Sequence, residues 1–556
     1  MRHGEHGLEG TIPAEIARME NRLLLLNGTF YTMDSAQPSA QAVAVRGSRV
    51  VAVGTDAELR GLATAGDWRI IDLQGRAVLP AFTDCHLHFL EYALKASRLA
   101  VEEQLPLEGV LSRVQEYVQH AEAGAWIRGS GWSDSTWPAG SLAWRQLLDR
   151  VAPQHPVVLT KKDGHVIWVN SGALGRAGVD ADTPEPSGGV IERDPETGQP
   201  TGLLKEEAMH LVCDAIPSLS AVERQAAMRR AVSEAHALGI TGIHDCGSWQ
   251  SVKDESFSDY QEMIGKDELG VRVFMMLSRA SLDEAIKVGL RTGFGDSYLR
   301  LGNVKLFCDG TLGSQTADMI EPFLGQPDNK GVAAISQEEL EGTVGRASKA
   351  GIACSVHAIG DRANRRVLDG FEKQRRAGVG RELRHRIEHV QVLHRDDVPR
   401  FKELQVIASM QPIHATQDMY LADRYWGQRA ELAYAWRSLL DSGARLAFGS
   451  DAPVESPNPL VGIHAAVTRQ RADGEPVGGW HPEQRLTVSE AVNAYTLGAA
   501  YASGTERERG SLTPGKLADL VILSQDIFEI APQEILSARV LATVFDGRIV
   551  HGSEDL

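Results

Sequence analysis

The chain contains few cysteines, few aromatic residues and no long apolar run. Its five cysteines (positions 85, 213, 246, 308 and 354) among 556 residues form no Cys-x-x-Cys pair. This spacing argues against a disulfide framework or a thiolate metal site, and it is typical of a reducing compartment. The apolar run Leu23 to Leu26 is too short for a signal peptide or a membrane span. We therefore expect a cytoplasmic protein.

The chain also has fewer basic than acidic residues. The chain has 57 Lys and Arg against 74 Asp and Glu, a formal charge of −17. Because an acidic surface repels nucleic acid and anionic lipid, neither is an expected partner. The composition, 43% hydrophobic and 24% charged, is that of a globular protein. We expect a small-molecule substrate, and a homodimer as the commonest assembly.

Short β-rich runs occupy both ends of the chain. Alternating Val and Ala on either side of Gly47-Ser48 predict a hairpin with a tight turn. Similar runs near the C-terminus, "GKLADLVILSQD" and "VLATVFDGRIVHG", contain a comparable Gly turn. We expect residues 1–75 and 505–556 to form one small β-sandwich domain, with residues 76–504 inserted between its two parts.

The central region alternates apolar strands with helical patterns, which predicts βα units and a parallel sheet. Eight such strands indicate an α/β fold of the (β/α)8 TIM-barrel type. They are expected within residues 77–88, 239–247, 271–277, 302–310, 351–358, 383–390, 404–412 and 444–453. Between the first and second lies an outsized segment, about 97–215, which we interpret as an insertion over the barrel mouth.

Two histidines close the first of these strands, in "VLPAFTDCHLHF". Alternate side chains of a strand share one face, so His86 and His88 are expected to point together into the barrel. Their position is near the carboxyl end of the strand, where barrel enzymes carry out their chemistry. The alternative is that the two histidines are a pair of hydrogen-bonded core imidazoles with no ligand.

Further polar residues recur where later strands end. These are Lys305, His357, His389 and Asp451. Such groups are costly in a barrel interior unless a metal or a partner satisfies them. Imidazole and carboxylate without thiolate favour zinc, with manganese, iron or nickel as alternatives. The sequence therefore predicts a divalent metal site at the barrel mouth.

With these residues in place, the chain resembles the amidohydrolase superfamily, specifically its amidohydrolase family 3 branch, which includes N-substituted formamide deformylase-like proteins. The motifs that carry the resemblance are "PAFTDCHLH", "DGHVIWVNS", "VKLFCDGTLGSQTA", "SVHAIGDRAN", "RIEHVQ" and "FGSDAPV". It extends over nearly the whole chain, and the order and spacing of the motifs are specific.

The resemblance implies a binuclear metal centre, with two zinc ions as the first expectation. His86, His88 and Asp451 would bind one ion, and His357 and His389 the other. Lys305 stands where binuclear members carry an N-carboxylated lysine that bridges both ions; a plain lysine in a mononuclear site is the alternative. A carbamate supplies two anionic oxygens, whereas an ammonium would be repelled by the ions.

The implied reaction is hydrolysis of a non-peptide C–N bond, in an amide, formamide or cyclic amide, by metal-activated hydroxide. Asp451 would accept the proton of the nucleophile and deliver it to the leaving nitrogen. A mononuclear deaminase is one alternative, weakened because Ala358, Ile359 and Gly360 follow His357 where such enzymes carry a catalytic Glu. An ester or lactone hydrolase and a catalytically silent binding protein also remain open.

Substrate contacts are expected from four further residues: Asp163, His165, His244 and His414. The first two belong to the Asp-Gly-His segment that lies near the mouth in the family, and the last two follow strands. Trp132 and Trp137 are expected either to line a lid over an apolar substrate or to pack within the insertion. Gly310, Gly313 and Gln315 are expected to shape the loop after the fourth barrel strand. Loops and the insertion determine specificity in such barrels, so the substrate itself stays open.

Overall fold

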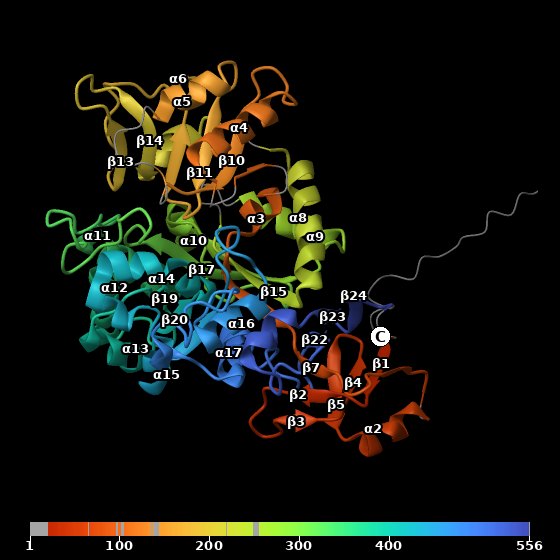
Figure 1. Ribbon diagram of the computed structural model, residues 1–556. Coiled ribbons are helices and arrows are strands. Elements are labelled where there is room, and N and C mark those ends of the chain that lie inside the picture. The colour runs from red at the N-terminus through yellow and green to blue at the C-terminus, as the bar shows by residue number, and fades with distance from the viewer. Residues whose placement is uncertain are drawn as a thin grey trace, which may run out of the picture.

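The computed structural model describes residues 21–64, 66–95, 98–101, 105–134, 137, 144–217, 219–247, 255–554 and 556. Residues 1–20, which are predicted to belong to the β domain, and most of the insertion segment 135–143 lie outside the described residues. The described chain forms a barrel, a β domain beside it and an insertion above it (Figure 1). None of its helices combines the length and the apolar character needed to cross a membrane.

The small β domain is assembled from both chain ends and contains two sheets. One has the strand order β5-β4-β1-β6, and the other has the order β24-β23-β22-β7-β2-β3. The strands are β1 (Arg22–Leu26), β2 (Thr29–Tyr31), β3 (Ser39–Ala40), β4 (Ala42–Arg46), β5 (Arg49–Gly54), β6 (Arg69–Asp72), β7 (Ala77–Pro80), β22 (Leu520–Leu523), β23 (Val540–Phe545) and β24 (Arg548–His551). The one α-helix of this domain among the described residues is α2 (Asp56–Ala63).

The predicted hairpin at Gly47-Ser48 is present. Arg46 pairs with Arg49 in the antiparallel ladder of β4 and β5, so the turn contains two residues. Gly47 has a φ of 59°, a left-handed value that glycine adopts without steric cost.

The predicted first barrel strand, residues 77–88, is in fact two strands. β7 pairs with β22 and β2 and belongs to the β domain, whereas β8 (Phe82–Leu87) belongs to the barrel. Pro80 has no backbone N–H and cannot donate to a ladder, so the chain leaves one sheet there and enters the other. The domain boundary predicted after residue 75 therefore lies after Pro80.

Eight parallel strands form the barrel, as predicted. They are β8, β15 (Ile240–Asp245), β16 (Arg272–Leu277), β17 (Leu299–Phe307), β18 (Cys354–Ala358), β19 (Arg386–His389), β20 (Ile407–Met410) and β21 (Arg445–Phe448), paired in this order. The barrel is closed just beyond β21, where Asp451 N–H donates to the His86 carbonyl at 2.7 Å and His88 N–H to that of Ala452 at 2.9 Å.

Gly449 makes this closure possible. A Cβ at position 449 would lie 2.4 Å from the backbone nitrogen of His86, closer than any side chain can approach. The absence of a side chain therefore lets the last strand approach the first metal-ligand candidate.

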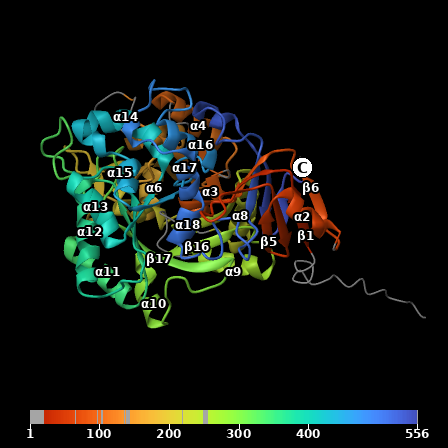
Figure 2. The same ribbon diagram turned by 90° about the horizontal axis from the view of Figure 1, so that it is seen from below.

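Helices cover the outside of the barrel, with the β domain on the opposite side from α11, α12 and α13 (Figure 2). They are α3 (Phe89–Lys95), α8 (Ala221–Ala237), α9 (Glu255–Gly265), α10 (Leu282–Lys287), α11 (Gln337–Lys349), α12 (Asp361–Arg376), α13 (Val398–Leu404), α14 (Pro412–Trp426), α15 (Trp436–Asp441), α16 (Pro459–Thr468), α17 (Val488–Tyr495) and α18 (Leu497–Ala502).

Helix α8 shows how the sequence specifies these elements. Ser220 and Glu223 form a reciprocal capping box that satisfies two free N–H groups at the first turn. Ala227, Met228 and Ala231 recur at the spacing of one helix face and are buried in the main hydrophobic cluster. The cap and the apolar face together fix where α8 begins and which side packs inward.

The insertion is a separate unit above the barrel mouth (Figure 1). Its strands pair in the order β13-β14-β12-β11-β10-β9. They are β9 (Leu99–Ala100), β10 (Ile127–Trp132), β11 (Val157–Lys161), β12 (Val166–Val169), β13 (Gly189–Arg193) and β14 (Pro200–Glu206), with helices α4 (Leu107–Val118), α5 (Trp144–Val151), α6 (Ser171–Ala177) and α7 (His210–Cys213). The core contains Trp132, Trp137, Trp144 and Trp168, with neighbouring ring centroids 5.3–6.0 Å apart.

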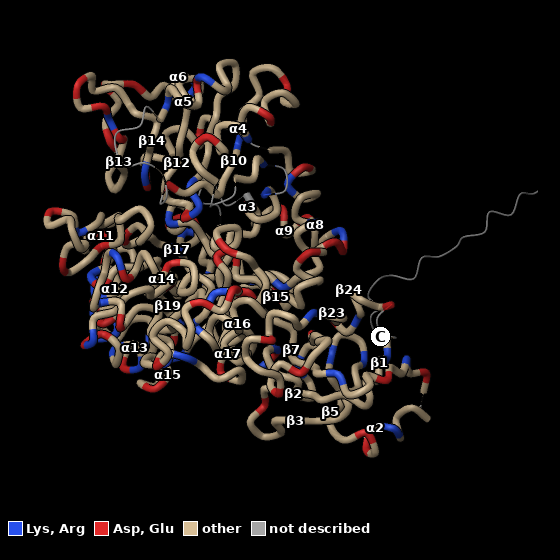
Figure 3. The backbone as a smooth tube through the Cα atoms, in the orientation of Figure 1, with Lys and Arg blue, Asp and Glu red and all other residues tan. Residues whose placement is uncertain are grey.

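Charged residues of both signs are distributed along all three parts of the chain (Figure 3). The acidic excess is thus a property of the whole chain and is not confined to one segment.

Candidate metal centre

The structure brings the six predicted ligands to the carboxyl ends of the barrel strands. His86 and His88 lie at the end of β8, and Lys305, His357 and His389 on β17, β18 and β19. Asp451 follows β21. All six side chains are buried. The two-residue period of a strand and the shared direction of the barrel strands account for this convergence.

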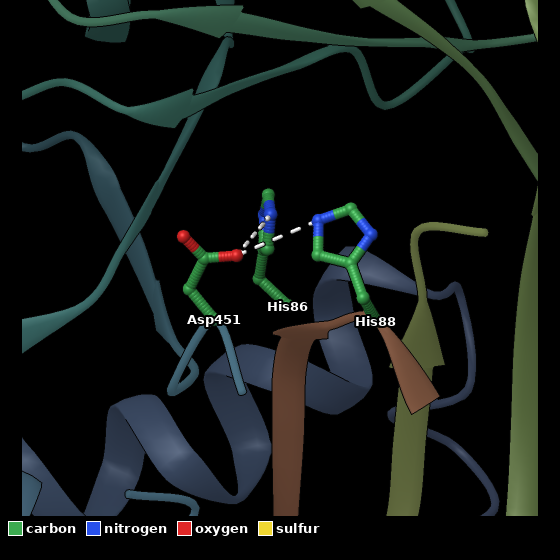
Figure 4. A group of neighbouring side chains, drawn as sticks. All are labelled: His86, His88 and Asp451. Carbon is green, nitrogen blue, oxygen red and sulfur yellow. Dashed lines mark ion pairs between the residues drawn. The ribbon is translucent and has the colours of Figure 1, made fainter. Parts of the chain in front are cut away.

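Three of these side chains meet most closely (Figure 4). Asp451 Oδ1 lies 3.4 Å from His86 Nε2 and 3.5 Å from His88 Nε2. The other ring nitrogen of His88 lies 2.6 Å from the Gly247 carbonyl oxygen, which can only accept a hydrogen bond. Nδ1 of His88 therefore carries the proton, and the lone pair of Nε2 faces Asp451. This arrangement fits a divalent metal ion.

Asp451 also belongs to a second group of side chains, which approaches its other carboxylate oxygen, Oδ2. Donor atoms of His389, His414 and Asp451 lie within 4.8 Å of one another. His414 Nε2 is 3.3 Å from Asp451 Oδ2, and His389 Nδ1 is 2.8 Å from the side-chain oxygen of Gln411. His414, predicted only as a substrate contact, thus lies against the Asp451 carboxylate.

His357 lies beside this second group. Its Nε2 is 3.1 Å from the Gly310 carbonyl, so Nε2 is the donor and Nδ1 carries the lone pair. Its ring centroid is 4.5 Å from that of His389. The pair predicted to bind a second ion is therefore adjacent.

Backbone conformation helps to direct two of these side chains. His389 and Asp451 have φ values of 73° and 62°, in the left-handed region that residues with a Cβ rarely adopt. Because of the conformation at position 389, both Glu388 and His389 contact His86, although neighbouring residues on a regular strand point to opposite faces. Strained positions of this kind cluster at functional sites.

Lys305 lies beside the first group. Its Nζ is 3.5 Å from His86 Nε2 and 4.9 Å from the ring centroid of Phe307. The amino group is thus next to one of the predicted ligands.

The electrostatic environment favours metal-binding forms of these groups. Burial lowers the pKa of His88 to about 3 and holds the pKa of His357 and of His389 well below the usual range. Burial alone would raise the pKa of Asp451, but the hydrogen bond from His414 and the imidazoles of His86 and His88 outweigh it and lower that pKa. Neutral imidazoles and an ionised carboxylate are the forms that bind zinc and its first-row neighbours.

A cavity of about 480 Å³ lies directly above the site, between the barrel and the insertion. His357, His389, His414 and Asp451 line it from the barrel side. The insertion contributes Trp132, Trp137, Trp144, Lys161, Lys162, Asp163, His165, Val166, Leu203 and Lys205. The wall combines apolar surface with a few polar groups, as small-molecule sites do.

Asp163 and His165 occupy this wall, as predicted, and connect the insertion to the barrel. Asp163 accepts a hydrogen bond of 2.6 Å from Ser314 Oγ. His165 Nδ1 lies 2.7 Å from Glu206, which in turn accepts one of 2.9 Å from Thr316 Oγ1. Since the ring centroid of His165 is 5.1 Å from that of His357, the insertion reaches the edge of the metal centre.

The loop after β17 has the tight geometry expected from its glycines. A Cβ at Gly310 would lie 2.1 Å from Thr316 Oγ1 and 2.3 Å from a carboxylate oxygen of Glu206. Gln315 has a left-handed φ of 54°, and both Gly313 and Gln315 line the cavity. The loop therefore passes close under the insertion.

His244 does not line the cavity, in contrast to its prediction as a substrate contact. Its Nδ1 lies 2.9 Å from the Arg386 guanidinium and 3.1 Å from Cys85 Sγ, inside the barrel. The side chain of His244 thus contacts Arg386 and Cys85 and not the cavity.

Comparison with known proteins identifies the family. The model of the amidohydrolase family matches residues 69–551, which is most of the chain. The chain belongs to the amidohydrolase family. The match includes all six predicted ligands, strands β6 and β7 of the N-terminal part of the β domain, and most of its C-terminal part.

Several curated relatives resemble this amidohydrolase over nearly its full length. Protein LONG AFTER FAR-RED 3 of Arabidopsis thaliana is 36% identical, with 95% of this chain and 91% of the relative covered. The putative amidohydrolase YtcJ of Bacillus subtilis is 30% identical (94% and 98% covered). The N-substituted formamide deformylase of Arthrobacter pascens is 31% identical (94% and 97% covered). The family assignment thus extends to relatives with and without a named reaction.

Solved structures agree with the fold. An uncharacterized metal-dependent hydrolase from Pyrococcus horikoshii OT3 matches with a TM-score of 0.75 and 26% identity, covering 92% of this amidohydrolase and 99% of that chain. A triazine hydrolase from Arthrobacter shares the fold alone, with a TM-score of 0.53 at 16% identity. Family and neighbours together support a hydrolase.

Sequence reasoning missed three buried charged residues around the site: Glu206, Arg386 and Glu388. For Arg386 and Glu388 the two-residue period of a strand gave no signal, because it places them on the face opposite to His389. Glu206 had no signal either. Its contact with His165 joins two strands that are not neighbours in the sequence.

Proposed function

We propose that this amidohydrolase is a metal-dependent enzyme that hydrolyses a non-peptide C–N bond in a small amide, formamide or cyclic amide. The observation that carries this proposal is the convergence of His86, His88 and Asp451, the last of which lines the 480 Å³ cavity. Such a site can bind a cation and place a substrate carbonyl next to it.

Relatives support the same class of reaction. One is named an N-substituted formamide deformylase, and a second is named a putative amidohydrolase. Both align over at least 94% of this chain.

Two divalent ions are the proposed cofactor, zinc first and manganese, iron or nickel as alternatives. His86, His88 and Asp451 would hold one, and His357 and His389 the other, with N-carboxylated Lys305 between them. When bound, the ions supply Lewis acidity that polarises the substrate carbonyl and makes water more acidic.

The chain's own residues then perform the proton transfers. Asp451 accepts a proton from the attacking water on its carboxylate and returns it to the leaving nitrogen, since an amine leaves as the protonated form. His414, 3.3 Å from Asp451 Oδ2, orients that carboxylate. Asp163 and His165 contact the substrate from the insertion side of the cavity, which shields the reaction from water.

The proposed setting is a cytoplasmic enzyme, dimeric in the C2 manner, that acts on small molecules and binds neither nucleic acid nor membrane. The acidic composition supports the exclusion of nucleic acid and anionic lipid, and the scattered cysteines support the compartment.

The test is a substrate panel assayed with zinc-loaded protein, chelator-treated protein and chelator-treated protein to which zinc is returned. The panel contains N-substituted formamides, acyl amides, cyclic amides, aminopurines and pyrimidines, and matched esters and lactones. We expect turnover of an amide class that chelation abolishes and zinc restores. Turnover confined to esters or to ammonia release from an aminated ring would overturn the C–N hydrolase proposal.

A further inference from the structure

We propose that Glu388 and Arg386 are positioning residues that hold His86 in the orientation and tautomer needed to bind a metal ion, and that His244 supports Arg386. This inference rests on the metal-dependent function proposed above. It concerns a layer of residues below the predicted ligands.

Strand β19 places both charges inside the barrel. Arg386 and Glu388 are two residues apart, so their side chains share the inward face, and both are fully buried. Two fully buried charges are costly to maintain unless hydrogen bonds and an opposite charge satisfy them. Their retention in a barrel core therefore indicates a task that an apolar pair would not perform.

The contact with His86 indicates that task. Glu388 Oε2 lies 2.6 Å from His86 Nδ1, and neither side chain is exposed. A carboxylate can only accept, so Nδ1 donates and the lone pair of Nε2 faces Asp451, 3.4 Å away. A carboxylate behind a histidine ligand fixes the ring orientation and makes the ligating nitrogen more basic.

Arg386 holds Glu388 in place through contacts with three other strands. Its guanidinium pairs with Glu388 Oε1 and donates to the Cys85 carbonyl at 2.9 Å and to Ser355 Oγ at 3.0 Å. A further contact of 2.9 Å is with His244 Nδ1. These partners lie on β8, β18 and β15, so the guanidinium spans the barrel interior beneath the metal centre.

This arrangement also explains His244. Arg386 has no acceptor atom, so His244 Nδ1 accepts the hydrogen bond and the ring is neutral. Burial and the neighbouring guanidinium hold the pKa of His244 well below the usual range, which agrees with that form. The histidine of the "GIHDCG" segment therefore serves the positioning layer.

The test measures zinc affinity by competition with a chromogenic chelator. The variants are Glu388→Gln, which keeps the shape and removes the charge, and the double variant Arg386→Met with Glu388→Gln, which leaves no unpaired buried charge. Asp259→Asn is the matched control, since Asp259 is a buried carboxylate bound to Arg224 at 2.6 Å on the outer helices. Thermal unfolding of the metal-free proteins reports folding separately.

We expect zinc affinity to fall about 10- to 100-fold in the double variant and in Glu388→Gln. The double variant should unfold near the wild-type temperature without metal, and Asp259→Asn should bind zinc as wild type does. Equal zinc affinity in wild type and the folded double variant would overturn the positioning role while leaving the proposed function intact. Wild-type protein that binds none of zinc, manganese, iron and nickel would overturn both.

Discussion

The backbone N–H of Asp451 donates a hydrogen bond of 2.7 Å to the carbonyl oxygen of His86. This bond joins the chain after the last barrel strand to the first strand, and the side chains of the same two residues approach to 3.4 Å. The proposed metal site is therefore built on the seam that closes the barrel. Anything that binds both side chains also holds the seam together.

Metal binding should consequently stabilise the protein. A ligand that binds only the folded form adds about 2.7 kcal/mol when its free concentration is 100 times Kd. We expect the thermal unfolding midpoint to fall on chelation, recover with zinc and rise further with the logarithm of zinc concentration. His88→Ala should abolish this zinc dependence. An unfolding temperature that changes neither on chelation nor on addition of zinc would contradict the predicted site.

Replacement of Asp451 by Asn should abolish most of the catalysis. Asn retains an oxygen donor but cannot take up a proton, and positioned proton transfer contributes roughly 10²- to 10⁴-fold. We expect kcat to fall within that range at saturating metal, with metal content measured on the same samples. Undiminished kcat in a variant that carries the wild-type amount of metal would rule out the proton-transfer role.

The eight strands and the convergence of the six candidate side chains could be foreseen because they depend on local periodicity. A two-residue period on a parallel strand is enough to aim His86 and His88 at one place. The same local reasoning misplaced the first domain boundary, since it read across Pro80 as one strand. It also placed His244 in the cavity, because depth along a strand depends on register with the neighbouring strands.

The pair His165 and Glu206 should make stability dependent on pH. Burial lowers the pKa of His165, but the Glu206 carboxylate outweighs it and raises that pKa to about 9, above the ordinary value of 6.5 for histidine. The charged pair thus contributes up to about 3 kcal/mol below pH 6.5, and this contribution is lost as pH rises through 9. In metal-free protein, the unfolding midpoint should fall more between pH 6 and pH 9 in wild type than in His165→Gln.

The control for this comparison is His394→Gln, since the side chain of His394 is 42% exposed. It should keep the wild-type pH dependence. Identical pH profiles for wild type and His165→Gln would show that the pair does not carry the effect.

Ser314→Ala should loosen the insertion over the cavity. It removes the 2.6 Å hydrogen bond to the Asp163 carboxylate, and hydrogen bonds to charged groups contribute about 1.5–3 kcal/mol. We expect faster amide hydrogen exchange in residues 158–168 and a higher KM, while the barrel strands exchange as before. Ser442→Ala, which removes a 2.6 Å bond to Leu439 on the barrel exterior, is the control. Equal exchange in the two variants would contradict a role for Ser314 in docking.

Long-range contacts account for what the sequence did not reveal. The insertion forms its own six-stranded sheet, and its approach to the barrel depends on contacts such as Glu206 with Thr316. The left-handed conformation of His389 was likewise not predictable, because positive φ is uncommon in any residue with a Cβ and no local pattern in the sequence marks it. Substrate identity depends on the same cavity wall and was not readable from any single segment.

The most direct test is the metal content per chain, measured by plasma mass spectrometry on protein purified without chelators and in the presence of bicarbonate. We expect about two divalent ions per chain in wild type and about one or fewer in Lys305→Ala, because the bridging carbamate is proposed to hold both ions. About one ion in both proteins would contradict the bridged site. Protein that contains no metal and takes up no zinc, manganese or nickel would contradict the metal-dependent hydrolase altogether.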